Sequence, residues 1–174
     1  MRGFNPPSHV RRVLAALGLA VTLAVGLAPV VAAATLTYAI SGVEYAATDV
    51  QAKFAGVAVA TDDNGTWLAV VDHSVLSGDP LGATISGGTF SFDGKVRDIA
   101  GTFDSGTLTQ TGGFTGCSNQ TFAVNGALAV TITPGGAASG LFSATLKHYR
   151  TLLFGRCITY AATVKGIVAF TLPG

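Results

Sequence analysis

Residues 120–132, with the sequence QTFAVNGALAVTI, decide the fold class of this chain. The large apolar side chains of this stretch occupy even positions: Phe122, Leu128, Val130 and Ile132. A repeat of two residues places them on one face of a β-structure, whereas a helix would need spacings of three and four. A two-residue turn at Asn125-Gly126 would put the side chains before and after it on opposite faces. The pattern therefore predicts a hairpin with a three-residue loop at 124–126.

Alternation of this kind recurs from Thr35 onward, and no stretch of a dozen residues after it keeps the spacing of a helix. Clusters of turn-forming residues interrupt the alternation at 62–65, 93–94, 134–140 and 155. Trp67, the only tryptophan, lies in the most apolar stretch and is expected in the core. We predict an all-β domain, an antiparallel β-barrel or β-sandwich of about 8–10 strands. The pattern leaves the choice between barrel and sandwich open.

The N-terminal stretch has the three parts of a helical secretory signal peptide. Residues 1–12 are basic, 13–31 carry no charge, and small residues follow up to Ala34. We predict cleavage between Ala34 and Thr35, which leaves residues 35–174 as a single domain. An uncleaved membrane anchor is the alternative, since the apolar run is about as long as a bilayer-spanning helix. The paired Arg11-Arg12 also fits a twin-arginine signal, and the arginine- and alanine-rich composition suggests a bacterial host.

Removal of residues 1–34 takes away three arginines, so the basic residues fall from ten to seven against nine acidic residues. The mature domain is then slightly acidic and offers no basic patch for nucleic acid. Contact with a membrane is expected only through the signal peptide before cleavage. The partner is open, and a small ligand or an envelope component would fit.

Cys117 and Cys157 are the only cysteines, and both follow the predicted cleavage site. An exported protein enters an oxidising compartment, so a disulfide between them is expected. It would close a loop of about 40 residues and stabilise the fold by about 4 kcal/mol. Two separate buried thiols are the alternative.

No specific catalytic or cofactor motif occurs in the chain. His73 and His148 are the only histidines after residue 34, and their spacing predicts no metal site and no cofactor. The neighbours Asp72 and His73 would point to opposite faces of a strand and cannot act as a pair. The densest polar and aromatic cluster holds His148, Tyr149 and Arg150, which are the candidate catalytic residues if the cluster lies at the mouth of a barrel.

These observations favour a secreted or cell-envelope β-domain that acts as a binding or structural module without catalysis. A small barrel enzyme, such as an isomerase, cyclase or hydrolase with a site near His148, is the alternative. An outer-membrane β-barrel is a further alternative, because short alternating strands also occur there.

Overall fold

The computed structural model describes residues 34–172 of the chain. The predicted signal peptide lies outside the described residues except for Ala34, and the predicted cleavage site falls where the first strand begins. Eight β-strands make up the described region: β1 (Thr35–Ala47), β2 (Gln51–Val59), β3 (Asn64–His73), β4 (Gly82–Gly94), β5 (Asp98–Gly112), β6 (Gln120–Thr133), β7 (Gly136–Leu153) and β8 (Arg156–Thr171).

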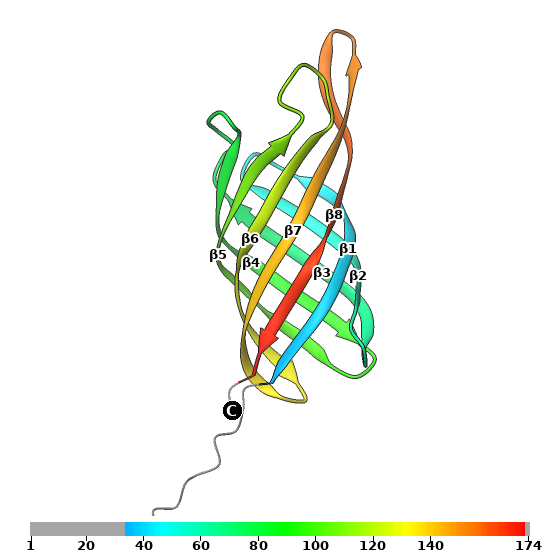
Figure 1. Ribbon diagram of the computed structural model, residues 1–174, viewed down its shortest axis with the longest axis vertical. Helices are drawn as coiled ribbons and strands as arrows, with labels where there is room; N and C mark the ends of the chain where they lie inside the picture. Colours follow the sequence, from blue (N-terminus) through cyan, green and yellow to red (C-terminus); the bar gives the residue numbers. More distant parts are fainter. Residues whose placement is uncertain (1–33, 173–174) are drawn as a thin grey trace, which may run out of the picture. The chain divides into compact units, whose positions relative to one another are not determined.

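The eight strands form a closed antiparallel barrel in which every strand pairs with its neighbours in sequence (Figure 1). β8 returns to β1 along a continuous ladder from the pair Thr35–Thr171 to the pair Val43–Thr163. The predicted all-β fold is confirmed, and of the two architectures left open the barrel is the one present. Closure leaves no sheet edge with unpaired backbone groups, which a sandwich of this many strands would have kept.

Gly155 lies in the turn between β7 and β8, as predicted. The other predicted turn clusters extend into strands, since 64–65 begin β3, 93–94 end β4 and 136–140 begin β7. The turns themselves are shorter and lie at 60–63, 95–97 and 134–135. The predicted hairpin at 124–126 is wrong, because these residues lie inside β6. Gly126 pairs with Gly106 on β5 and with Phe142 on β7. A Cβ atom at this glycine would lie 2.6 Å from the Phe142 ring. The glycine therefore makes room for a ring and does not form a turn, while the parity argument was correct in placing Phe122 and Leu128 on one buried face.

Trp67 on β3 also packs its ring against glycines of neighbouring strands. Its neighbours in register are Gly56 on β2 and, one strand further, Gly42 on β1. A Cβ atom at either glycine would lie 2.8 Å from the indole ring. The indole Nε1–H donates to the carbonyl oxygens of Val57, at 3.1 Å, and Ser41, at 3.3 Å. The only tryptophan is thus buried, as predicted, against a wall that two glycines make flat.

One end of the barrel is closed by packed aromatic side chains. The Tyr38 ring lies 4.9 Å from the Phe92 ring and 6.1 Å from the Phe170 ring, measured between centroids. The Tyr38 hydroxyl donates to Asp63 Oδ2 at 3.0 Å, and Asp63 Oδ1 accepts the backbone N–H of Val96 at 3.0 Å. Asp63 is buried, so its carboxylate links β1 to the β2–β3 and β4–β5 turns from inside this closed end.

Arg97 adds charge to the closed end. Its guanidinium lies 2.7 Å from the Asp62 carboxylate and 3.9 Å from that of Asp63. The hydrogen bond from Arg97 holds the pKa of Asp62 below its usual range. Burial raises the pKa of the Tyr38 hydroxyl, and its hydrogen bond to Asp63 raises it further. Tyr38 therefore stays protonated and continues to donate to Asp63.

Candidate functional site

A cavity of about 150 Å³ occupies the half of the barrel opposite the closed end. All eight strands contribute inward side chains to its wall, and Thr48 and Leu76 from two loops reach its rim. The cavity is left unfilled because several inward positions carry the small residue alanine, namely Ala47, Ala52, Ala69 and Ala144. At the closed end the inward positions carry rings instead. The cavity thus follows from small residues at one height of the barrel and aromatic residues at the other.

The wall of the cavity is almost entirely apolar. Phe54, Phe90 and Leu128 are among the buried side chains that line it, and Trp67 forms part of the same wall. An apolar wall of this kind offers dispersion contacts to an apolar guest. Polar side chains occur only toward the mouth, where the strands end.

Glu44 and His148 are in hydrogen-bond contact in the wall near the mouth. His148 Nε2 on β7 lies 3.1 Å from Glu44 Oε2 on β1, and the two side chains are only 17% and 10% exposed. A carboxylate can only accept hydrogen bonds, so Nε2 carries the hydrogen in this contact. The His148 ring also packs at 5.3 Å from the Phe122 ring. A donor and an acceptor are therefore held together at the edge of an apolar cavity.

Irregular strand pairing accompanies the polar residues of the mouth. The β1–β2 register shifts directly after Glu44, and the β7–β8 register shifts one residue after His148. The β3–β4 register shifts at His73, which also lines the cavity. A shift of one residue bends a strand and changes the direction of nearby side chains. The three inward polar groups thus lie where the regular barrel ladder breaks.

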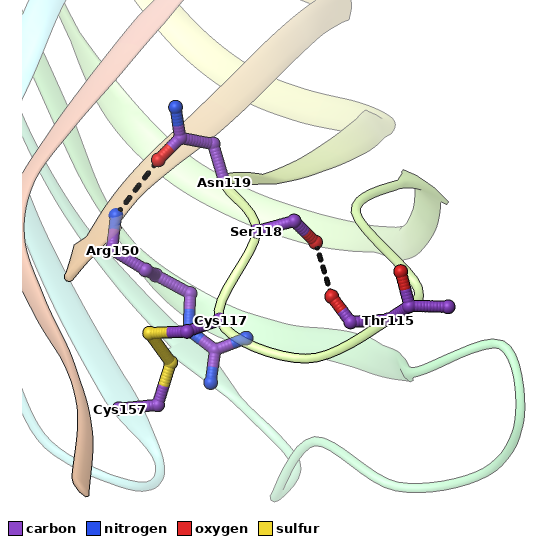
Figure 2. The surroundings of a disulfide bond; sticks show 6 residues. All are labelled: Thr115, Cys117, Ser118, Asn119, Arg150 and Cys157. Atoms are coloured by element: carbon purple, nitrogen blue, oxygen red, sulfur yellow. Dashed lines mark hydrogen bonds between the residues drawn. A yellow bond between two sulfur atoms is a disulfide. The ribbon is translucent and has the colours of Figure 1, made fainter. Parts of the chain in front are cut away.

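The sequence-predicted candidates do not form one cluster. His148 lines the cavity, but the Tyr149 ring packs 6.4 Å from the ring of Tyr160. Lys147 Nζ lies 5.0 Å from the centre of the Tyr149 ring. The backbone N–H of Arg150 donates to Asn119 Oδ1 at 2.9 Å, a contact drawn in Figure 2. Neither Tyr149 nor Arg150 is among the residues that line the cavity. Of the three candidates, only His148 belongs to this site.

Glu44 is the residue that sequence reasoning missed. It continues the even-numbered inward phase of β1, which otherwise carries apolar side chains and a glycine. A single acid on the inward face of an otherwise apolar strand is a signal that the alternation itself could have provided. Its partner His148 is 104 residues away in sequence, so the contact depends on the closure of the barrel.

His73 and Asp72 take part in separate contacts, as their opposite orientation on a strand predicts. His73 Nδ1 lies 2.8 Å from the carbonyl oxygen of Ser74. The Asp72 carboxylate accepts a hydrogen bond from Gln51 Nε2 at 2.8 Å. These two neighbours do not form a catalytic pair.

The predicted disulfide between Cys117 and Cys157 is present, with the two Cα atoms 5.5 Å apart. It joins the β5–β6 loop to the start of β8 at the open end of the barrel (Figure 2). The Asn119–Arg150 hydrogen bond joins the same loop to β7. The wall of the mouth is therefore crosslinked on this side.

Within residues 34–172, no group of three or more histidine, cysteine or acidic side chains is arranged to hold a metal ion. The same residues include no helix that is long and apolar enough to cross a membrane. Comparison of the chain with protein families, with curated proteins and with solved structures found no match.

Proposed function

We propose that this protein is an exported binding module that holds a small apolar ligand inside its barrel. The observation that carries the proposal is the apolar cavity at the open end, with a single Glu44–His148 contact in its wall. Export is supported by the signal-like N-terminus and by a disulfide, which persists in oxidising compartments.

The cavity also defines the ligand class. A volume of about 150 Å³ equals that of apolar protein cavities that accept benzene. The ligand is therefore a single ring or a short branched chain, buried against Trp67 and Phe90. A hydroxyl or carbonyl group at one end of it would meet Glu44 or His148 at the mouth.

The polarity of the barrel favours this function over an outer-membrane barrel. Membrane-spanning barrels are polar inside and present an apolar band to lipid. Here most buried inward side chains are apolar, and Asp63 and Gln110 are the buried polar exceptions. The outward positions of β5 and β6 carry mainly threonine, serine and alanine, whereas other strands also expose large apolar side chains, among them Val57, Leu68 and Leu141. The apolar interior is therefore the observation that favours a binding barrel. The exposed Asp93 and Lys165 belong to other strands of the wall.

Titration with toluene tests the proposal, because Trp67 lines the cavity and is the only tryptophan of the chain. We expect a saturable change in its fluorescence. Ala144→Leu fills part of the cavity and should weaken binding by at least about tenfold, since larger inward side chains remove the space. Ala129→Leu, at an exposed position on β6, is the matched control and should bind as the parent does. Equal binding by both variants would place the ligand elsewhere.

A small barrel enzyme is the second candidate, and the Glu44–His148 contact favours it. An imidazole that is held by a carboxylate beside a ligand cavity can act as a general base. Hydrolysis of p-nitrophenyl acetate tests this function directly. Turnover that is proportional to protein concentration and lost in both His148→Gln and Glu44→Gln would support catalysis. Turnover that both variants retain would remove it.

A further inference from the structure

The hairpin formed by β7 and β8 extends beyond the other loops at the open end of the barrel (Figure 1). We call residues 149–160 the finger. β7 and β8 are the longest strands, with 18 and 16 residues, and they stay paired as far as Leu153 and Arg156. Their pairing continues past the point where neighbouring strands have ended, so the finger is an ordered hairpin.

The tip of the finger exposes large apolar side chains. Phe154 is 96% exposed, and its neighbours Leu152 and Leu153 are 66% and 47% exposed. Phe154 also has a φ of 50°, a left-handed conformation that favours glycine and costs other residues about 1–2 kcal/mol. Neither the turn nor the barrel core benefits from a phenylalanine at this position. The side chain is therefore available to contact a partner.

Positively charged residues lie along the hairpin from its base to this apolar tip. Lys147, Arg150 and Arg156 belong to the finger or its base, and no acidic residue occurs after Asp104 in the chain. Asp49 and Asp79 lie in the β1–β2 and β3–β4 loops, which the finger passes beyond in Figure 1. A polar rim of cations around exposed aromatic and aliphatic residues is the composition of segments that lie in the interface of an anionic bilayer.

The base of the finger is fixed before any partner binds. The Cys117–Cys157 disulfide and the Asn119–Arg150 hydrogen bond both tie it to the β5–β6 loop (Figure 2). That loop exposes a second aromatic side chain, Phe114, at 60%. A hairpin that is already ordered loses little conformational entropy on binding.

We propose that the finger binds the interface of an anionic phospholipid bilayer. Leu152, Leu153 and Phe154 enter the boundary between headgroups and acyl chains, and Arg150 and Arg156 contact the phosphates. From the sequence, membrane contact is expected only through the signal peptide, and the finger adds a second membrane contact to that expectation. The cavity mouth lies at the same end of the barrel, so the protein would turn the cavity mouth toward the lipid when it is bound to the bilayer. Binding of the finger to a bilayer does not depend on whether the cavity holds a ligand.

Sedimentation with vesicles tests this proposal on the mature, disulfide-bonded protein. We expect binding to vesicles of phosphatidylcholine with phosphatidylglycerol, weakened by added salt, and much less binding to phosphatidylcholine alone. Phe154→Gly should reduce binding by about tenfold or more. Folding is not at risk in this variant, because the side chain is exposed and glycine is favoured at its φ. Arg150→Gln and Arg156→Gln should each reduce binding by about fivefold.

Two control variants separate the finger from general surface effects. Val96→Ser removes an exposed apolar residue at the closed end, and Lys165→Gln removes an exposed cation from the barrel wall. Both should bind vesicles as the parent does. In Phe154→Trp, the added indole should shift its fluorescence to the blue only with anionic vesicles.

Three outcomes would overturn the proposal. The first is the absence of vesicle binding, and the second is equal binding to neutral and anionic vesicles. The third is self-association that Phe154→Gly abolishes without any vesicle binding, which would assign the finger to contacts between copies of this chain.

Discussion

Asp63 and Asp62 are adjacent acids with different environments, and their substitution tests whether the buried Asp63 carboxylate holds the closed end of the barrel together. The Asp63 side chain is 0% exposed, whereas that of Asp62 is 58% exposed. Asp63→Ala leaves the Tyr38 hydroxyl and the Val96 N–H without their acceptor, and it takes one of two carboxylates from Arg97. A buried polar group left without a partner costs about 1–3 kcal/mol. Since Val96 is partly accessible to water, we expect a total loss of about 2–4 kcal/mol.

Urea unfolding of the disulfide-bonded protein measures this loss. With a slope of about 1–3 kcal/mol per molar urea, the midpoint of Asp63→Ala should fall by roughly 1–2 M. Asp62→Ala is the matched control on the same turn, and its midpoint should change by less than half as much, since its bridge to Arg97 is exposed to solvent. A double-mutant cycle of Asp63→Ala with Tyr38→Phe should give a coupling of about 1 kcal/mol. An equal effect of the two aspartate substitutions, or a coupling near zero, would refute the assignment of Asp63 as the buried link.

Three further predictions concern the wall, the closed end and the crosslink. Gly56→Ala should destabilise the fold by about 1–3 kcal/mol or prevent folding, because its Cβ would overlap the carbonyl oxygen of Ser41 on β1. Gly87→Ala is the control and should have little effect in the same urea assay, since the atom nearest to its Cβ would be 3.8 Å away. The pKa of Tyr38 is raised in the folded barrel, so above about pH 10 the unfolded chain releases the Tyr38 proton while the folded barrel retains it. The free energy of unfolding therefore falls as pH rises, and Tyr38→Phe should flatten this decline between about pH 9 and 11. Replacement of Cys117 and Cys157 by serine should lower the free energy of unfolding by about 3–4 kcal/mol in parallel urea titrations.

Alternation of apolar residues was enough to predict the all-β fold and the inward phase of the strands. Phase is a local property, because successive side chains of a strand point to opposite faces whatever the strand pairs with. Phe122 and Leu128 were therefore placed correctly on one face even though the loop between them was predicted wrongly. Gly126 is compatible with a turn and with close approach to a ring, and only the pairing of β6 with β7 separates these two roles.

The site was less accessible from sequence than the fold. His148 was predicted as a candidate because polar and aromatic residues cluster around it, but the cluster extends along one strand and beyond a register shift. Tyr149 and Arg150 therefore do not line the cavity with His148. Glu44 joins the site only because the strands close into a barrel. The cavity forms where small inward side chains of neighbouring strands lie at the same level along the barrel axis. That level is set by the register between strands, whereas the alternation along one strand shows only which side chains point inward.

Crystals of residues 35–174 exposed to xenon test whether the barrel holds an apolar ligand, because xenon enters apolar cavities that water leaves empty. We expect a xenon site inside the open half of the barrel, in contact with Trp67, Phe90 and Leu128, and its loss in Ala144→Leu. An absence of xenon there, or ordered water filling the same space, would contradict the claim that this barrel holds an apolar ligand.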